Sequence, residues 1–372
     1  MTSRAGWGTR VFGCLLALAA GWFLVVHGGD LLPAIGNVAS MGPHVLPIAL
    51  ALVLLGVVNR GLQARASFRL VELPASLSTM TSLSAASYAT NKVVKSGGAA
   101  GLVPYFAHAD REGHCRARVA AAYIASKLAE TISLVVLITA AVASSWAAGG
   151  LHGTALFGAV GSGIYALVVG IGVVLIASRR SIVERAARLG HAVASRGRRL
   201  LGKPEPVHTG DASAAGELSD ALGRLRRDPK AASPLVFTAV GGKLLGFAGL
   251  LLVLSGLGIH LSVATVLLVY TLTLMASLVG PLPGGIGVAD ASLGALLIAN
   301  GVHAPMAAAA VVAFRLLDLW LPLLAGGAAW GATLRRHRRL DAELAAALDP
   351  GLEVASPDQD MPGVLTQPAF AA

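Results

Sequence analysis

The sequence predicts an all-α integral membrane protein with six full spans and two Gly/Pro-broken hairpins, arranged as two inverted repeats. Three observations lead to this fold class. Hydrophobic residues make up 55% and charged residues 13% of the 372 residues, whereas a soluble domain carries about a quarter charged residues. Long apolar runs recur along the chain, as bilayer spans require. Two of these runs are interrupted by glycine-rich stretches at corresponding places in the two halves.

The apolar runs and the polar stretches between them divide the chain into four parts. In the first membrane half, residues 1–177, we expect a broken hairpin at 70–108 and spans at about 11–26, 45–58, 119–148 and 155–177. Residues 178–232 hold 12 of the 29 Lys and Arg residues and should form a basic cytoplasmic loop. The second membrane half, 233–334, should contain a span at 235–257, a broken hairpin at 261–304 and a span at 305–331. Residues 335–372 should form a cytoplasmic, mostly disordered tail.

The first run, 11–26, could also be read as a signal peptide. We expect an uncleaved span instead, because no clear small-x-small cleavage site with a polar continuation follows it.

The positions of Lys and Arg predict the orientation. They cluster beside apolar runs, at Arg4 and Arg10, in expected loops at 60–69, 111–118 and 179–230, and at 335–339, whereas none occurs between His260 and Phe314. By the positive-inside rule the clusters are cytoplasmic, as are both termini of this multi-pass protein. Hairpin 70–108 then begins and ends inside, while hairpin 261–304 begins and ends outside. The same distribution argues against nucleic acid as a partner, despite a net charge of +10.

The two halves match in sequence as well as in pattern. Lys127 and Glu130 lie 188 positions before Arg315 and Asp318, and Gly113 lies 188 positions before Gly301. The pair Gly97-Gly98 lies 187 positions before Gly284-Gly285. Because the charge rule gives the two copies opposite orientations, they are predicted to be inverted repeats. Such repeats, with broken helices at matching places, indicate a substrate site near the bilayer midplane.

The glycine breaks are the first group of candidate binding residues. Backbone groups freed by Gly and Pro find no water in hydrocarbon, so a break must lie inside protein or beside a wet cavity. Lys92 and Lys95 either snorkel to the surface or contact a lipid phosphate. Asp290 is either an acid stabilised by the helix dipole or a site for a coupling ion or proton. The candidates at the breaks are Asn91, Lys92, Lys95, Gly97 and Gly98, then Pro283, Gly284, Gly285, Gly287 and Asp290.

Charged residues inside spans are the second group. Lys127 with Glu130, and Arg315 with Asp318, are spaced i,i+3, which places each pair on one helix face. Each pair is either a self-neutralised structural lock or a functional pair facing a wet cavity. Lys243 has no acid near it in sequence, so it either pairs across helices or faces the cavity.

Motifs of enzymes are missing from the sequence. It has no metal-spaced His/Cys/carboxylate cluster, no Gly-x-Ser-x-Gly elbow and no Walker-type loop. Its two cysteines, Cys14 and Cys115, predict no disulfide framework. We therefore expect neither an enzyme nor a cofactor or metal.

With these residues in view, the chain resembles the flippase-like family that is also named for the transmembrane region of lysylphosphatidylglycerol synthases. The resemblance rests on Asn91-Lys-Val-Val-Lys-Ser-Gly-Gly-Ala-Ala-Gly101, on Pro283-Gly-Gly-Ile-Gly-Val-Ala-Asp290-Ala, and on the Lys127/Glu130 and Arg315 helices. It covers nearly the whole chain, but not the aminoacyl-transferase domain of full-length synthases. Where that family commonly has Arg-Glu after the second glycine motif, this chain has Ala289-Asp290.

The resemblance implies a lipid translocase that moves an anionic or aminoacylated phospholipid, or a lipid-linked headgroup, between leaflets. Its partners would be anionic membrane lipids, and the resemblance implies a location in the plasma membrane of a prokaryote. Lys92, Lys95, Lys127 and Arg315 would attract phosphate, and Glu130, Asp290 and Asp318 would balance them. The alternative is a membrane scaffold, without transport, for a separate lipid-modifying or glycosyl-transferring enzyme. A small-solute or ion-coupled transporter is a further, weaker alternative.

Overall fold

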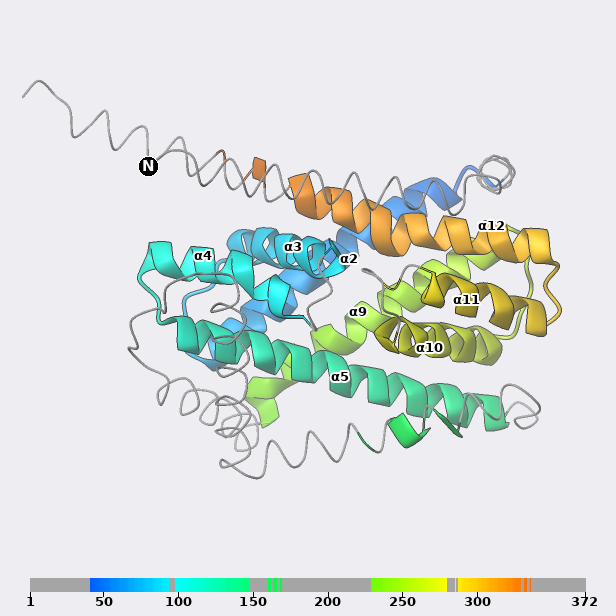
Figure 1. The fold of residues 1–372 in the computed structure, drawn as a ribbon, viewed down its shortest axis with the longest axis horizontal. Coiled ribbons are helices and arrows are strands. Elements are labelled where there is room, and N and C mark those ends of the chain that lie inside the picture. The colour runs from blue at the N-terminus through cyan, green and yellow to red at the C-terminus, as the bar shows by residue number, and fades with distance from the viewer. Residues whose placement is uncertain are drawn as a thin grey trace, which may run out of the picture. The chain divides into compact units, whose positions relative to one another are not determined.

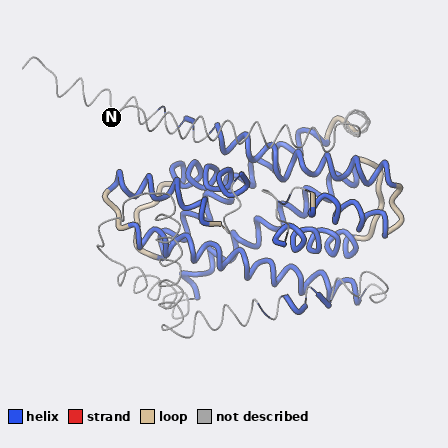
Figure 2. The backbone as a smooth tube through the Cα atoms, viewed as in Figure 1, coloured by secondary structure: helices blue, strands red, loops and turns tan. Residues whose placement is uncertain are grey.

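The structure is a computed structural model that describes residues 41–93, 98–147, 229–279, 285 and 287–328, and also residues 160, 161, 163–165, 168, 331, 332 and 335. Across these residues the secondary structure is helical and includes no strand (Figure 2). The chain divides into two compact units, Met1–Trp330 and Gly331–Ala372, and the first contains all the helices with defined bounds.

Four helices are long and apolar enough to cross a membrane. They are α2 (Val45–Leu70), α5 (Arg116–Ala147), the part Ser233–Gly256 of α9 (Pro229–Gly256), and a continuous helix Ala304–Ala328. The last begins as α12 (Ala304–Arg315) and passes through a π-helical turn, η3 (Leu316–Trp320). These four helices correspond to the expected spans at 45–58, 119–148, 235–257 and 305–331. The expected span at 11–26, most of 155–177, most of the loop 178–232 and the tail lie outside the described residues.

Helix α2 extends further than the expected span, which the sequence places at 45–58 before a basic loop. The helix continues to Leu70, because after its first turn no proline occurs before Pro74, and it ends where Glu72 adopts a φ of +58°. Arg60 and Gln63 thus belong to the helix and not to a loop. This extension is what allows α2 to contribute polar side chains to the interior.

The two glycine-broken segments each form a pair of short helices that lie side by side (Figure 1). In the first, α3 (Leu77–Val93) is followed by η1 (Ala99–Gly101) and α4 (Leu102–Glu112). In the second, α10 (Val263–Val279) is followed by α11 (Val288–Ala299). Helices of 17 and 12 residues are shorter than the ~20 residues that cross a hydrocarbon core of ~30 Å. The expected helix–break–helix arrangement is therefore present, while the inversion of the two halves stays a prediction.

The buried apolar side chains form one larger cluster in each half. One joins α2, α3, α4 and α5 through residues such as Phe68, Met80 and Tyr105. The other joins α9, α10, α11 and α12, with Leu250, Leu297 and other buried aliphatic side chains. Close packing on both sides fixes the helices whose polar faces meet between the clusters.

Candidate functional site

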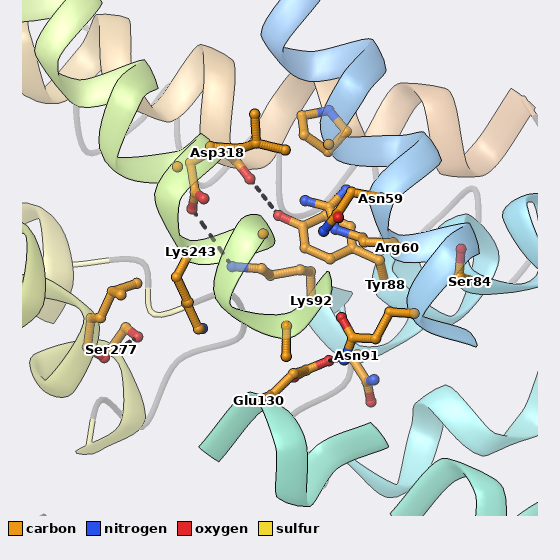
Figure 3. A pocket seen from close by; sticks show the side chains of 18 of the residues that line it. Asn59, Arg60, Ser84, Tyr88, Asn91, Lys92, Glu130, Lys243, Ser277 and Asp318 are labelled. Carbon is orange, nitrogen blue, oxygen red and sulfur yellow. Dashed lines mark hydrogen bonds and ion pairs between the residues drawn. The ribbon is translucent and has the colours of Figure 1, made fainter. Parts of the chain in front are cut away.

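A cavity of about 630 Å³ opens among α2, α3, α5, α9, α10, α11 and the helix that continues α12. Its wall combines apolar residues with polar residues from both halves. Figure 3 shows labelled side chains from several of these helices facing a common space. Burying charges in apolar surroundings is costly, so such residues in membrane helices generally line functional cavities. The charged lining residues are Arg60, Lys92, Lys127, Lys243 and Arg315, together with Glu130, Asp290 and Asp318.

The first glycine break is held by a neutral network centred on Asn91. The backbone N–H of Gly101 donates to Asn91 Oδ1 at 2.8 Å, and Asn91 Nδ2 donates to the Tyr123 hydroxyl at 2.8 Å. That hydroxyl donates to the carbonyl of Gly98 at 2.7 Å. Gly98 has a φ of +96°, which suits glycine. Asn91 therefore positions the break, and its amide is already committed to protein groups.

Space at this break is tight. A Cβ at Gly101 would lie 2.1 Å from Asn91 Nδ2, 2.4 Å from the Tyr123 hydroxyl and 2.6 Å from Ser87 Oγ. Only glycine lets the backbone approach the network so closely. The described end of the first break consequently has a defined, closely packed conformation.

The second break is held by an ionic network. Arg315 Nε donates to Asp290 Oδ1, and Arg315 Nη2 donates to the carbonyl of Gly285 at 3.2 Å. The other carboxylate oxygen, Asp290 Oδ2, accepts the backbone N–H of Gly287 at 2.8 Å, where α11 begins. The side chains of Arg315 and Asp290 are only 7% and 6% exposed. Asp290 thus caps α11 and neutralises Arg315 at the same time.

This arrangement corrects the expected i,i+3 pairing of Arg315 with Asp318. Within the described residues, the Arg315 salt bridge is to Asp290, while Asp318 lies 3.8 Å from Lys92 Nζ. The reason is the π-helical turn Leu316–Trp320, which widens the helix directly after Arg315 and changes the direction of Asp318 relative to it. Single π-turns of this kind occur frequently at functional sites.

The contact between Lys92 and Asp318 links the two halves across the cavity. Lys92 lies near the end of α3, just before the first break, and Asp318 lies in the π-turn. Tyr88 donates its hydroxyl hydrogen to the Asp318 backbone carbonyl. Figure 3 shows these three side chains together at one side of the cavity. The side chains of Lys92 and Asp318 are 25% and 29% exposed, so their ion pair is accessible from the cavity.

The expected pair of Lys127 and Glu130 is present on α5. Lys127 Nζ lies 2.9 Å from both carboxylate oxygens of Glu130. Gln63 of α2 also donates to Glu130, at 3.3 Å. At 40% and 38% exposure, this pair lines the cavity without being closed off by protein.

Several cavity residues lie elsewhere than the sequence predicts. Arg60, expected in a basic loop, lies on α2, where the polar residues Asn59, Arg60, Gln63 and Ser67 recur at helical spacing and continue one face of the helix. Lys243 proves to face the cavity. Tyr88 was not singled out, and nothing in its sequence context marks it. Of the remaining candidates, Lys95, Gly97, Pro283 and Gly284 lie outside the described residues.

The lining therefore brings together the candidate acids and bases that the structure describes, from both halves of the chain, around one cavity. A family model described as the lysylphosphatidylglycerol synthase TM region matches residues 10–326. The chain belongs to this family. No curated protein matches it.

Membership in the lysylphosphatidylglycerol synthase transmembrane-region family agrees with the four helices that can span a bilayer. The protein is thus a multi-pass membrane protein of a lipid-related family. The match covers the membrane part alone, in which the cavity and both glycine breaks are found.

Proposed function

We propose that this protein is a lipid translocase that moves a lipid with an anionic or aminoacylated headgroup, or a lipid-linked headgroup, between leaflets. The proposal rests chiefly on one observation. A cavity lined by eight described charged side chains lies among helices that are otherwise apolar. A headgroup needs such a polar space to leave the aqueous interface, while its acyl chains stay in lipid.

The broken helix pairs support the same function. In transporters with inverted repeats, discontinuous helices place their ends at a substrate site near the midplane. Here the ends of α3 and α11 carry Lys92 and Asp290, and both residues line the cavity. We propose that both helix pairs are re-entrant hairpins in a prokaryotic plasma membrane and that the N- and C-termini of the chain are cytoplasmic. Translocation involves no covalent step.

A scaffold role would be favoured if each ion pair were closed off by packing. Only Arg315–Asp290 is nearly inaccessible, whereas Lys127–Glu130 and Lys92–Asp318 retain a quarter or more of their exposure. Two of the three pairs can therefore exchange partners with a headgroup, which a passive scaffold does not require.

The test is leaflet exchange of fluorescent lipids in vesicles containing the purified protein. We expect protein-dependent movement of anionic lipids, strongly reduced in Lys92→Gln and Glu130→Gln. Arg69→Gln is the matched control, because Arg69 is exposed on α2 and does not line the cavity. If the wild-type protein moves no lipid across several headgroup classes, a translocase is excluded and a scaffold remains.

A further inference from the structure

The charges of the cavity do not balance within the described residues. Five cationic side chains face three carboxylates. Each carboxylate has its own base: Glu130 holds Lys127 and Asp290 holds Arg315, while Asp318 lies nearest to Lys92. In the described part of the chain, Arg60 and Lys243 have no carboxylate oxygen within 4.0 Å. Two positive charges are thus left over.

The surplus charges lie beside the ion pair that links the two halves. The Arg60 guanidinium lies 4.1 Å from the centroid of the Tyr88 ring, and Lys92 Nζ lies 5.3 Å from the same centroid. A cation over an aromatic face gains a modest attraction, but its charge is not neutralised. Arg60 therefore remains able to attract an anion.

Lys243 approaches the same place from α9. Its charged neighbours are Glu130, Lys127, Asp318 and Lys92, none of the acids being its own ion-pair partner. Figure 3 shows its side chain extending toward the space beside Lys92 and Glu130. The two surplus cations thus enter the cavity from two neighbouring helices, α2 and α9, and Lys92 of α3 lies near both.

An uncompensated charge in low-dielectric surroundings is unfavourable, and a bound counter-charge relieves this cost. A headgroup with two negative charges would neutralise the described lining. A headgroup with one negative charge would leave one cation unmatched. A headgroup with a net positive charge, such as a lysyl ester of a phosphodiester lipid, would add to the imbalance.

We propose that the cavity selects a lipid whose headgroup carries at least two negative phosphate charges, a phosphomonoester or a pyrophosphate, with Arg60 and Lys243 as its counter-charges. This proposal rests on the proposed translocase function and narrows its substrate class. Phosphomonoesters carry about −1.5 to −2 charges at neutral pH, and the guanidinium fork of Arg60 matches two phosphate oxygens. Aminoacylated phospholipids are then poor substrates, in contrast to what the family description suggests.

The test is equilibrium binding to the full-length protein in neutral detergent, which does not require transport. The probes are dioctanoyl phosphatidic acid, farnesyl pyrophosphate, dioctanoyl phosphatidylglycerol, a short-chain lysyl-phosphatidylglycerol and inorganic pyrophosphate. We expect the first two to bind at least tenfold more tightly than phosphatidylglycerol, and the lysyl lipid to bind most weakly. Equal or tighter binding of phosphatidylglycerol or of the lysyl lipid would overturn the proposal.

Binding of inorganic pyrophosphate shows whether the ligand is a lipid headgroup or a free phosphate compound. Weaker binding than farnesyl pyrophosphate supports a lipid ligand, whereas equal binding indicates a site for free phosphate and contradicts a lipid headgroup. Selective binding without leaflet exchange would sustain the charge selection but refute translocation. Leaflet exchange with equal rates for all headgroups would support translocation but refute the charge selection.

Variants assign the selectivity to the two cations. Lys243→Gln and Arg60→Gln should each reduce the preference for phosphatidic acid over phosphatidylglycerol at least fivefold, while Lys243→Arg and the control Arg69→Gln retain it. Because Lys243 has no acid of its own, Lys243→Gln should leave the midpoint of thermal unfolding of the ligand-free protein unchanged or higher. A lower midpoint with unchanged headgroup preference would show a structural role and overturn the assignment. The wild-type headgroup series decides the proposal even if a variant does not fold.

Discussion

The buried ion pair between Asp290 and Arg315 allows a quantitative prediction for Asp290→Asn. The substitution keeps the size of the side chain but removes the negative charge from a pair that is only 6–7% exposed. Arg315 would then remain charged in a site whose carboxylate has been lost. Breaking one partner of a buried pair typically costs about 3–5 kcal/mol, and loss of the charged acceptor for the Gly287 N–H acts in the same direction.

The free energy of unfolding can be measured by titration with sodium dodecyl sulfate in mixed micelles. We expect Asp290→Asn to destabilise the protein by about 3–5 kcal/mol. Glu130→Gln provides the comparison and should cost less, because its pair with Lys127 is 38–40% exposed to the cavity, where water can solvate the lysine that is left without its partner.

A double-mutant cycle completes this experiment. Asp290→Asn combined with Arg315→Gln should recover part of the lost stability, because the second substitution removes the charge that the first leaves unneutralised. The reasoning is refuted if Asp290→Asn and Glu130→Gln lower the free energy of unfolding equally. It is also refuted if the double variant loses as much free energy of unfolding as its two single variants lose together, or more.

Three further predictions concern the first break and the topology. Gly101→Ala should distort the break, because the added Cβ would lie 2.1 Å from Asn91 Nδ2; increased proteolysis between α3 and α4 would show it, and wild-type resistance would contradict it. Tyr123→Phe removes one hydroxyl that both donates and accepts within the Asn91 network and should cost about 1–3 kcal/mol in the same titration, whereas no measurable change would mean that the network contributes little. His303→Cys, in a protein with its native cysteines replaced by serine, should react with an impermeant thiol reagent added outside whole cells, and labelling from the cytoplasmic side alone would disprove the inverted repeats.

The class of the fold and the places of its breaks were predictable because composition and periodicity report them directly. Apolar runs of span length define four of the expected membrane helices, and glycine clusters define the helix–break–helix units. The pair Lys127–Glu130 was predictable too, since i,i+3 neighbours meet on any regular α-helix. The long-range clamp of Asn91 on Tyr123 was not, because it depends on tertiary packing between α3 and α5.

The partner of Arg315 could not be predicted from spacing, because the π-turn interrupts the regular helix just where that spacing was applied. Arg60 was misplaced for a different reason. The positive-inside rule treats an arginine after an apolar run as a surface residue, and here the helix continues past it for ten more residues, to Leu70. Both Arg315 and Arg60 line the cavity, and their positions depend on tertiary packing around it more than on the local sequence pattern.

The π-turn at Leu316–Trp320 also changes what the last described membrane helix can contact. One extra residue in a helical turn shifts the angular phase of all later side chains by about 100°. Before the turn, Ala307, Ala310 and Phe314 face the apolar cluster of the second half. After it, Gly326 lies so close to α3 that a Cβ would be 2.4 Å from the carbonyl oxygen of Ala85. One continuous helix therefore packs against the apolar cluster of the second half near its start and against α3 of the first half near its end, so both halves share it as a common wall.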